Sequence, residues 1–147
     1  MESIDFRFSI FDFRLNKVTS LINRGAYDQI NSLSKNMTAT LLPLQSSAIQ
    51  LREAIEYPAA GVLSKILVKD NNCQYTLLCL TAGSEVSEHS SPRNATVNVV
   101  EGKGILTLEG KDIVLEPGVF VFMPARALHA LKAEVNLAFI LTFSETN

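Results

Sequence analysis

Two segments carry the most specific pattern in this chain of 147 residues. Residues 83–95 read GSEVSEHSSPRNA, and residues 117–129 read PGVFVFMPARALH. They contain the only two histidines of the sequence, His89 and His129. Because an imidazole changes its protonation near neutral pH and can bind a proton or a metal, a pair of histidines is a natural centre for binding or catalysis. Any chemistry that this chain performs is therefore expected in these two segments.

The sequence around the two segments predicts short β-strands joined by turns. Beyond Gly61, apolar and β-branched runs alternate with clusters of Gly, Pro, Asn and Asp. Pro117-Gly118 fits the two central positions of a type II turn, because proline holds φ at about −65° and glycine accepts a positive φ. Eight strands at regular spacing, with almost no helical pattern, predict an all-β sandwich or small barrel. The predicted strands cover residues 62–69, 73–82, 95–101, 104–109, 112–116, 119–124, 128–133 and 136–143.

The first 44 residues differ from the rest and are predicted to be an N-terminal extension of a barrel domain over residues 45–147. Residues 4–10 alternate between apolar and polar side chains, which indicates an added edge strand, either of this barrel or exchanged with a partner. Residues 15–22 show the apolar spacing of a short helix. Met37 stands directly before the barrel pattern, so we expect that the barrel does not need the preceding residues.

A second short helix is predicted between the extension and the first strand of the barrel. Ser47 and Gln50 fit the S-x-x-Q capping box, in which a serine hydroxyl caps the helix N-terminus. The helix is expected to end at Tyr57-Pro58, because a proline disfavours helical geometry in the residue before it.

The composition excludes several classes of function. The chain is sized for one domain, with 47% hydrophobic and 19% charged residues and a formal net charge of −2. It has no dense Lys/Arg patch, so a nucleic acid is not an expected partner. No apolar run reaches the ~18 residues of a spanning helix, so we expect no membrane contact and a cytoplasmic protein. Cys73 and Cys79 are separated by roughly 20 Å of predicted strand, so both are expected to be free thiols.

The two segments resemble the motifs of the cupin superfamily, which read G-x5-H-x-H-x3-E-x6-G and G-x5-P-x-G-x2-H-x3-N. The residues in register are Gly83, His89 and Gly102 in the first motif and Gly118, Pro124 and His129 in the second. The resemblance extends over about residues 45–144 and looks closest to small single-domain bacterial cupins of the type-2 class. It implies a double-sheet jelly-roll barrel, here preceded by a short helical or irregular N-terminal extension, in agreement with the strand pattern.

The resemblance also implies a metal site, but the set of metal ligands is incomplete. In metal-binding cupins the first motif supplies two histidines and a glutamate, and the second motif supplies one histidine. Here Ser91 stands in the second histidine position and Ala95 in the glutamate position. A stable site for a first-row metal usually needs three or four ligands, so we expect no metal or other cofactor. If a divalent metal does bind, the candidate ligands are His89, His129 and Cys79.

Other side chains are not expected to complete this ligand set. Glu88 faces the opposite side of an extended strand from His89. Glu85 shares the side of His89 but lies roughly 13 Å away along the strand. Cys79 would be near only if its strand runs beside the histidines, and its position on one strand face with Leu77 is more typical of core packing.

Three functions remain open, and we favour the first. It is a small cupin that binds a small molecule inside an apolar barrel, with catalytic residues unassigned and with polar contacts from His89, His129, Ser91, Arg93 and Arg126. The two arginines would favour a carboxylate-bearing ligand, unless they are solvated loop residues. The second function is a metal-dependent oxygenase or isomerase with an atypical ligand set. The third is a dimerising structural or regulatory module.

A homodimer is also expected. Residues 119–123 are apolar on both faces of a predicted strand, and we interpret Phe122 and Met123 as core residues. An apolar outer face of this kind commonly marks a subunit interface. The expected partners are therefore a small-molecule ligand and a second copy of this chain.

Overall fold

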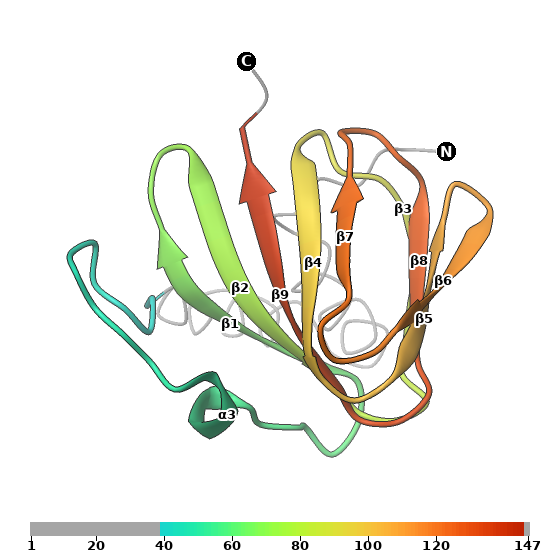
Figure 1. Ribbon diagram of the computed structural model, residues 1–147, viewed down its shortest axis with the longest axis horizontal. Coiled ribbons are helices and arrows are strands. Elements are labelled where there is room, and N and C mark those ends of the chain that lie inside the picture. Colours follow the sequence, from blue (N-terminus) through green and yellow to red (C-terminus); the bar gives the residue numbers. More distant parts are fainter. Residues whose placement is uncertain (1–38, 146–147) are drawn as a thin grey trace, which may run out of the picture.

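Residues 39–145 are described by the computed structural model, and they form two antiparallel β-sheets that enclose one core (Figure 1). One sheet has five strands in the order β1-β2-β9-β4-β7, and the other has four in the order β3-β8-β5-β6. A one-turn helix, α3 (Leu51–Ala54), precedes the first strand. The strands are β1 (Val62–Lys69), β2 (Cys73–Leu80), β3 (Glu85–His89), β4 (Asn94–Glu101), β5 (Gly104–Leu108), β6 (Lys111–Leu115), β7 (Phe120–Met123), β8 (His129–Ala133) and β9 (Leu137–Ser144).

The chain crosses repeatedly from one sheet to the other, which is the path of a double-sheet jelly roll. All eight predicted strands are present, with bounds that differ from the prediction by no more than two residues. The structure adds β3, which lies inside residues 83–95 and was not among the predicted strands. Four of its five residues are charged, polar or histidine, so the strand lacks the apolar run by which the others were found. The predicted all-β jelly-roll barrel is confirmed.

The main core lies between the two sheets. Every second side chain of a strand points inward, so β9 contributes Phe139, Leu141 and Phe143 to one continuous apolar cluster. The four-stranded sheet contributes Leu106 and Leu115 from the opposite side. Burial of an aliphatic or aromatic side chain of this size stabilises a fold by about 1.5–3 kcal/mol, so this cluster is what holds the two sheets together.

A second apolar cluster covers part of the outer face of the five-stranded sheet. Leu77 and Cys79 of β2 point away from the main core and pack with Ala138 of β9 and Ala54 of α3. The predicted core role of this strand face is confirmed for these two residues. Cys79 and Cys73 are both free thiols, as predicted.

The predicted capping box is wrong. The helix begins at Leu51 rather than after Ser47, and its N-cap residue Gln50 makes no side-chain cap hydrogen bond. The Ser47 hydroxyl instead donates to the Gln45 carbonyl oxygen at 3.0 Å. A helix of one turn has little structure for a cap to stabilise, and α3 is held by packing of Ala54 against the sheet.

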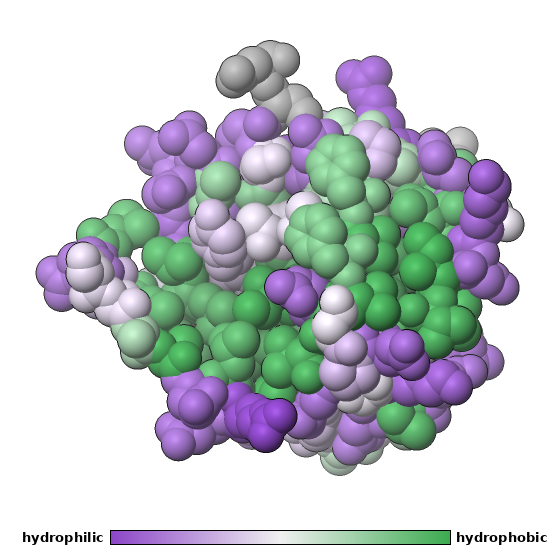
Figure 2. Space-filling model, in the orientation of Figure 1, coloured by the Kyte–Doolittle hydropathy of each residue, from purple (hydrophilic) through white to green (hydrophobic). Residues whose placement is uncertain are grey.

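Phe122 and Met123 of the edge strand β7 were both predicted to be core residues, but their side chains lie on opposite faces of the sheet. Met123 is buried with Val121 in the main cluster, as predicted. Phe122 is 54% exposed, and Phe120 is 62% exposed, so the prediction for Phe122 is wrong. Among the described residues, the segment that includes α3 packs against β1, β2 and β9, and no residue of β7 belongs to this cluster. Figure 2 shows hydrophobic surface over much of this face of the molecule.

The turn before β7 has the predicted geometry. Gly118 has a φ of +92°, and the Val119 N–H donates to the Glu116 carbonyl oxygen at 3.0 Å. These are the positive φ and the closing hydrogen bond of a type II turn with Pro117-Gly118 at its centre.

The predicted strand over residues 4–10 and the predicted helix over residues 15–22 lie outside the described residues. The last part of the predicted extension lies against the barrel, because the Leu41 and Leu42 N–H groups donate to carbonyl oxygens of β1 at 2.9 and 2.8 Å. In the part of the chain that the structure describes, no helix has the length and apolar character to span a bilayer.

Candidate functional site

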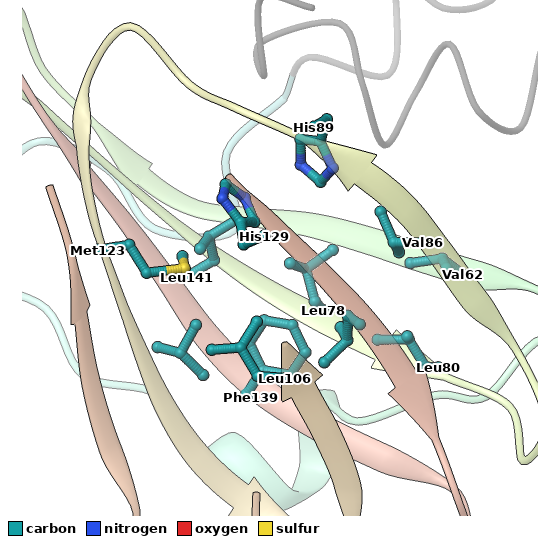
Figure 3. Close-up of a pocket in the computed structure, with 12 residues that line it drawn as sticks. Val62, Leu78, Leu80, Val86, His89, Leu106, Met123, His129, Phe139 and Leu141 are labelled. Atoms are coloured by element: carbon teal, nitrogen blue, oxygen red, sulfur yellow. The ribbon is translucent and has the colours of Figure 1, made fainter. Parts of the chain in front are cut away.

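The structure brings the two histidines into direct contact. β3 and β8 pair antiparallel, and His89 lies opposite His129 in their register. The ring centroids are 4.3 Å apart with an interplanar angle of 61°, an edge-to-face arrangement (Figure 3). Both side chains are buried, with 5% of each residue exposed. We call the end of the barrel that carries this pair the histidine end.

Hydrogen bonds define which nitrogen of each imidazole carries the proton. His89 Nδ1 lies 2.7 Å from the Ser87 carbonyl oxygen, and His129 Nδ1 lies 2.9 Å from the Ala127 carbonyl oxygen. A carbonyl oxygen only accepts hydrogen bonds, so both Nδ1 atoms are the donors. In a neutral imidazole the other nitrogen, Nε2, is then the acceptor.

The surroundings keep both imidazoles neutral. The pKa of His89 is lowered to about 4, mainly by burial. The hydrogen bond to Ser87 opposes this shift, and the nearby His129 adds to it. Burial also lowers the pKa of His129, against the opposing effect of the Ala127 hydrogen bond. Desolvation disfavours the charged form because a buried imidazolium loses its hydration. The pair therefore presents two hydrogen-bond acceptors at neutral pH.

A small cavity lies inside the barrel beside the histidines. Its volume is about 30 Å³, enough for roughly two water molecules. Apart from the two histidines, the described residues that line it are apolar, as Figure 3 shows. The apolar lining residues are Val62, Leu78, Leu80, Val86, Val97, Leu106, Met123, Leu131, Phe139 and Leu141. The cavity admits only a small or narrow group unless these side chains move.

A β-bulge places His89 in the interior. On a regular strand, residues three positions apart face opposite sides. Val86 and His89 are nevertheless both buried, because the register between β3 and β8 shifts between them. The expectation that Glu85 shares the side of His89 is therefore wrong. Glu85 is exposed and forms an ion pair with Lys132 at 3.0 Å. Glu88 is exposed, as expected from its position next to His89.

The remaining candidate ligands do not complete a metal site. Leu78 and Leu80 of β2 line the cavity, so Cys79 between them points to the outer face of the sheet and packs in the second cluster. The prediction of Cys79 as a candidate third metal ligand is therefore wrong. Ser91 is buried, and its hydroxyl oxygen accepts a hydrogen bond from the Arg93 N–H at 3.1 Å. Ala95 is buried and offers only a methyl group. Residues 39–145 contain no group of three His, Cys, Asp or Glu side chains that could hold a metal ion. The described side chains therefore do not fit the cupin metal set.

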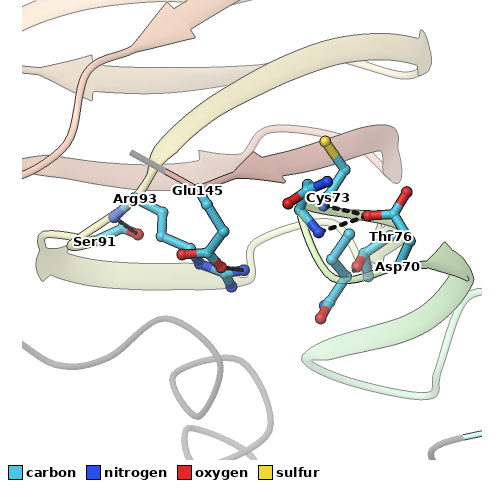
Figure 4. Close-up of polar contacts among 8 residues, drawn as sticks. Asp70, Cys73, Thr76, Ser91, Arg93 and Glu145 are labelled. Carbon is cyan, nitrogen blue, oxygen red and sulfur yellow. Dashed lines mark hydrogen bonds and ion pairs between the residues drawn. The ribbon is translucent and has the colours of Figure 1, made fainter. Parts of the chain in front are cut away.

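The two arginines have different environments. Arg93 is buried, and its Nη1 lies 3.3 Å from Glu145 Oε1 (Figure 4). Its guanidinium stacks 4.7 Å from the Phe143 ring centroid. Arg126 is exposed and has a φ of +70° at the position where the family motif prefers glycine. Its N–H donates to the Ser91 carbonyl oxygen at 2.6 Å. A solvated loop role thus describes Arg126 and not Arg93.

Sequence reasoning missed Glu145 and Phe143 as neighbours of Arg93. They lie 50 and 52 residues away along the chain, and the pairing of β4 with β9 brings them close. In this pairing Asn94 lies opposite Ser144, and Ala95 lies opposite Phe143. No local sequence signal could have identified this contact, because it depends on the register between two distant strands.

The architecture defines the class of the protein: a jelly-roll barrel with a histidine from each of two adjacent strands at one end. The family model of the cupin domain matches residues 76–143. This match and the shared fold support assignment of the chain to the cupin superfamily.

Solved structures with the same fold include proteins without an established role. A conserved protein of unknown function from Streptococcus pyogenes is 25% identical, with a TM-score of 0.63 over 70% of this chain and 90% of that chain. A Cupin 2 conserved barrel domain protein from Leptotrichia buccalis is 30% identical, with a TM-score of 0.62 over 66% of this chain and 47% of that one. A cupin superfamily protein from Desulfitobacterium hafniense DCB-2, at 23% identity, shares the fold, with a TM-score of 0.65 over 73% of this chain and 97% of that one. A search of curated proteins finds no match.

Proposed function

We propose that this chain is a ligand-binding cupin, in which a small molecule donates a hydrogen bond to the histidine pair and places its apolar part in the mouth of the barrel. The observation that carries the proposal is the matched geometry of His89 and His129. Each ring commits its Nδ1 proton to a backbone carbonyl oxygen, so each Nε2 is an acceptor. Two neutral acceptors beside an apolar cavity suit a ligand with a hydroxyl or amine donor.

The size of the cavity limits how such a ligand would bind. A volume of about 30 Å³ accommodates the donor group and the carbon next to it. The remainder of the molecule would lie at the histidine end, where Met123 is a flexible lining residue that can adapt its shape. A metal-dependent oxygenase or isomerase is the less favoured alternative, because Ser91 and Ala95 supply no metal ligands beside the histidines.

The isomers 1-butanol and diethyl ether test the proposal, because they have the same formula and only the alcohol has an O–H donor. We expect 1-butanol to bind the full chain more tightly than the ether in isothermal titration calorimetry. Replacement of either histidine, His89→Phe or His129→Phe, is expected to weaken alcohol binding by about two- to tenfold, the value of one hydrogen bond. Phenylalanine keeps an aromatic ring of similar size and removes the acceptor.

Two outcomes would contradict this proposal. One is equal binding of the two isomers, or alcohol binding that neither histidine variant changes. The other is a stoichiometric Fe, Mn, Ni or Zn ion in the purified protein that His89→Ala and His129→Ala both remove, which would favour the enzyme. Long-range ¹H–¹⁵N NMR spectra of the histidine rings provide an independent check, because Nδ1 should carry the proton in both rings.

We also propose that two copies of the chain associate along β7. This strand ends the five-stranded order, so one of its edges has no strand partner among the described residues. Phe120 and Phe122 project from its outer face and are more than half exposed. A two-fold axis brings two copies of one edge strand together in antiparallel orientation, which is the pairing that the rest of this sheet uses.

The double variant Phe120→Ser/Phe122→Ser is expected to weaken the dimer by at least about a hundredfold, because each buried phenylalanine contributes about 1.5–3 kcal/mol. Sedimentation equilibrium across a concentration series measures this change. Val114→Ser is the matched control, because Val114 is an exposed apolar residue on β6 of the other sheet. A monomeric parent chain, or equal dissociation of the parent and the double variant, would refute an interface at β7.

A further inference from the structure

Arg93 is a charged residue held out of solvent. Its side chain is 10% exposed and stacks over Phe143. A guanidinium stays protonated at physiological pH, so its burial is unfavourable unless its N–H groups find acceptors. The stacking contact compensates only part of this loss of hydration, because a cation–π contact is a weak interaction. A nearby anion would therefore stabilise the buried guanidinium of Arg93.

The anion that the described residues supply is a weak partner. Arg93 Nη1 contacts Glu145 Oε1 at 3.3 Å, whereas strong charge-assisted hydrogen bonds are about 2.7–2.9 Å long. The Glu145 side chain is 53% exposed, so water competes for its carboxylate. Nη2 of Arg93 is shielded from solvent and has no hydrogen-bond partner within residues 39–145. Within residues 39–145, Nη1 thus makes one weak hydrogen bond and Nη2 makes none.

The location of Arg93 connects it to the histidine pair. The loop that follows His89 leads directly to Arg93, and a hydrogen bond from the Arg93 N–H to the Ser91 hydroxyl oxygen holds this loop. Phe143, on which the guanidinium stacks, follows the cavity-lining Leu141 on the inner side of β9. Arg93 therefore lies at the same end of the barrel as the histidine pair.

We infer that Arg93 is a carboxylate-binding site at the histidine end, and that Glu145 is a resident counter-ion which a ligand carboxylate replaces. A carboxylate can accept from Nη1 and Nη2 together, in the bidentate arrangement that Glu145 does not make. This inference rests on the proposed function, because it names the second polar group of the bound molecule. The ligand class is a small hydroxycarboxylate or aminocarboxylate, with its donor at the histidines and its carboxylate at Arg93.

The test compares hydroxy acids with alcohols of the same chain length. 4-Hydroxybutyrate and 6-hydroxyhexanoate place a carboxylate at two distances from the hydroxyl, and 1-butanol and 1-hexanol replace that carboxylate with a methyl group. At constant ionic strength, we expect calorimetry to show at least one hydroxy acid binding the full chain about tenfold more tightly than its matched alcohol. Arg93→Gln should abolish this advantage.

Glu145→Gln supplies a second test that keeps the buried arginine in place. Removal of the competing carboxylate should increase hydroxy acid affinity by about two- to fivefold, because an ion pair with an exposed carboxylate is weak. Glu85→Gln is the matched control, because it also removes an exposed glutamate from an ion pair but lies on the outer face of β3, and it should have no effect.

The outcomes separate this inference from the proposed function. If the alcohols bind through the histidines but the hydroxy acids bind no better, Arg93 is a structural residue and only the inference fails. The inference also fails if neither Arg93→Gln nor Glu145→Gln changes the affinity for the hydroxy acids. If the hydroxy acids bind through Arg93 and the histidine variants have no effect, the role of the histidines fails while the carboxylate site stands. Absence of binding by all four probes overturns both.

Discussion

Gly102→Ala is expected to destabilise the fold by more than about 4 kcal/mol, a loss seen only where a substitution creates a severe backbone or packing conflict. Gly102 has a φ of +90°, and a Cβ placed there would overlap the Asn136 carbonyl oxygen and lie 2.7 Å from Leu137 Cα. These are backbone atoms at the start of β9, so they cannot move without displacing a strand of the core. Urea denaturation, with the midpoint and slope compared between variants, measures the loss.

Gly110→Ala is the control that distinguishes the cost of a positive φ from the cost of the steric overlap with β9. Gly110 has a similar φ of +78°, but no atom of residues 39–145 lies within 4 Å of a Cβ built there. Its substitution should cost about 1–2 kcal/mol, the penalty of a left-handed conformation alone. Equal losses for the two variants would contradict the close approach of residue 102 to β9.

The second large effect is a loss of stability on mild acidification. The pKa of His89 is about 4 in the folded chain and about 6.5 as an exposed side chain, so between these values the unfolded chain binds more protons than the folded chain. The contribution of His89 is therefore fully present above pH ~6.5 and is lost as the pH falls towards 4. The free energy of unfolding should decrease by on the order of 3 kcal/mol from this group, since one pKa unit corresponds to about 1.4 kcal/mol. His129 acts in the same direction.

His89→Asn isolates this contribution from the titration of carboxylates. Asparagine can keep a donor to the Ser87 carbonyl oxygen but does not titrate. Between pH 6.5 and 4, the variant should lose less stability than the parent chain in urea denaturation. Parallel stability curves for the two proteins would show that His89 is not a buried neutral imidazole. Ligand binding through Nε2 of His89 should persist over this range and fail only below about pH 4, because the folded imidazole stays neutral above its pKa and an imidazolium cannot accept a hydrogen bond.

Most of the fold could be predicted from local patterns. Turn residues such as Pro117-Gly118 and apolar runs such as residues 62–69 placed eight strands, because strand formation and turn geometry depend on neighbouring residues. β3 was missed because Glu85, Ser87 and Glu88 interrupt its apolar pattern. Phe122 was misassigned because the apolar pattern of β7 does not say whether a second layer covers its outer face.

The candidate site was predictable only in part. The motif spacing pointed to His89 and His129, and the missing ligands at positions 91 and 95 were visible in the sequence. The parity argument for Glu85 failed at the bulge, because one extra residue in a strand changes which side chains share a face. The exclusion of Cys79 needed the orientation of β2 relative to the core.

The sequence by itself determined the jelly roll and the two histidine positions, because alternation, turn residues and motif spacing are properties of short segments. Tertiary structure alone decided that the histidines touch, that each proton lies on Nδ1, and that Arg93 is buried beside Glu145. These features depend on the registers of β3 with β8 and of β4 with β9, which join residues up to fifty positions apart. Register is a balance among all the side chains of a sheet, so no single segment encodes it.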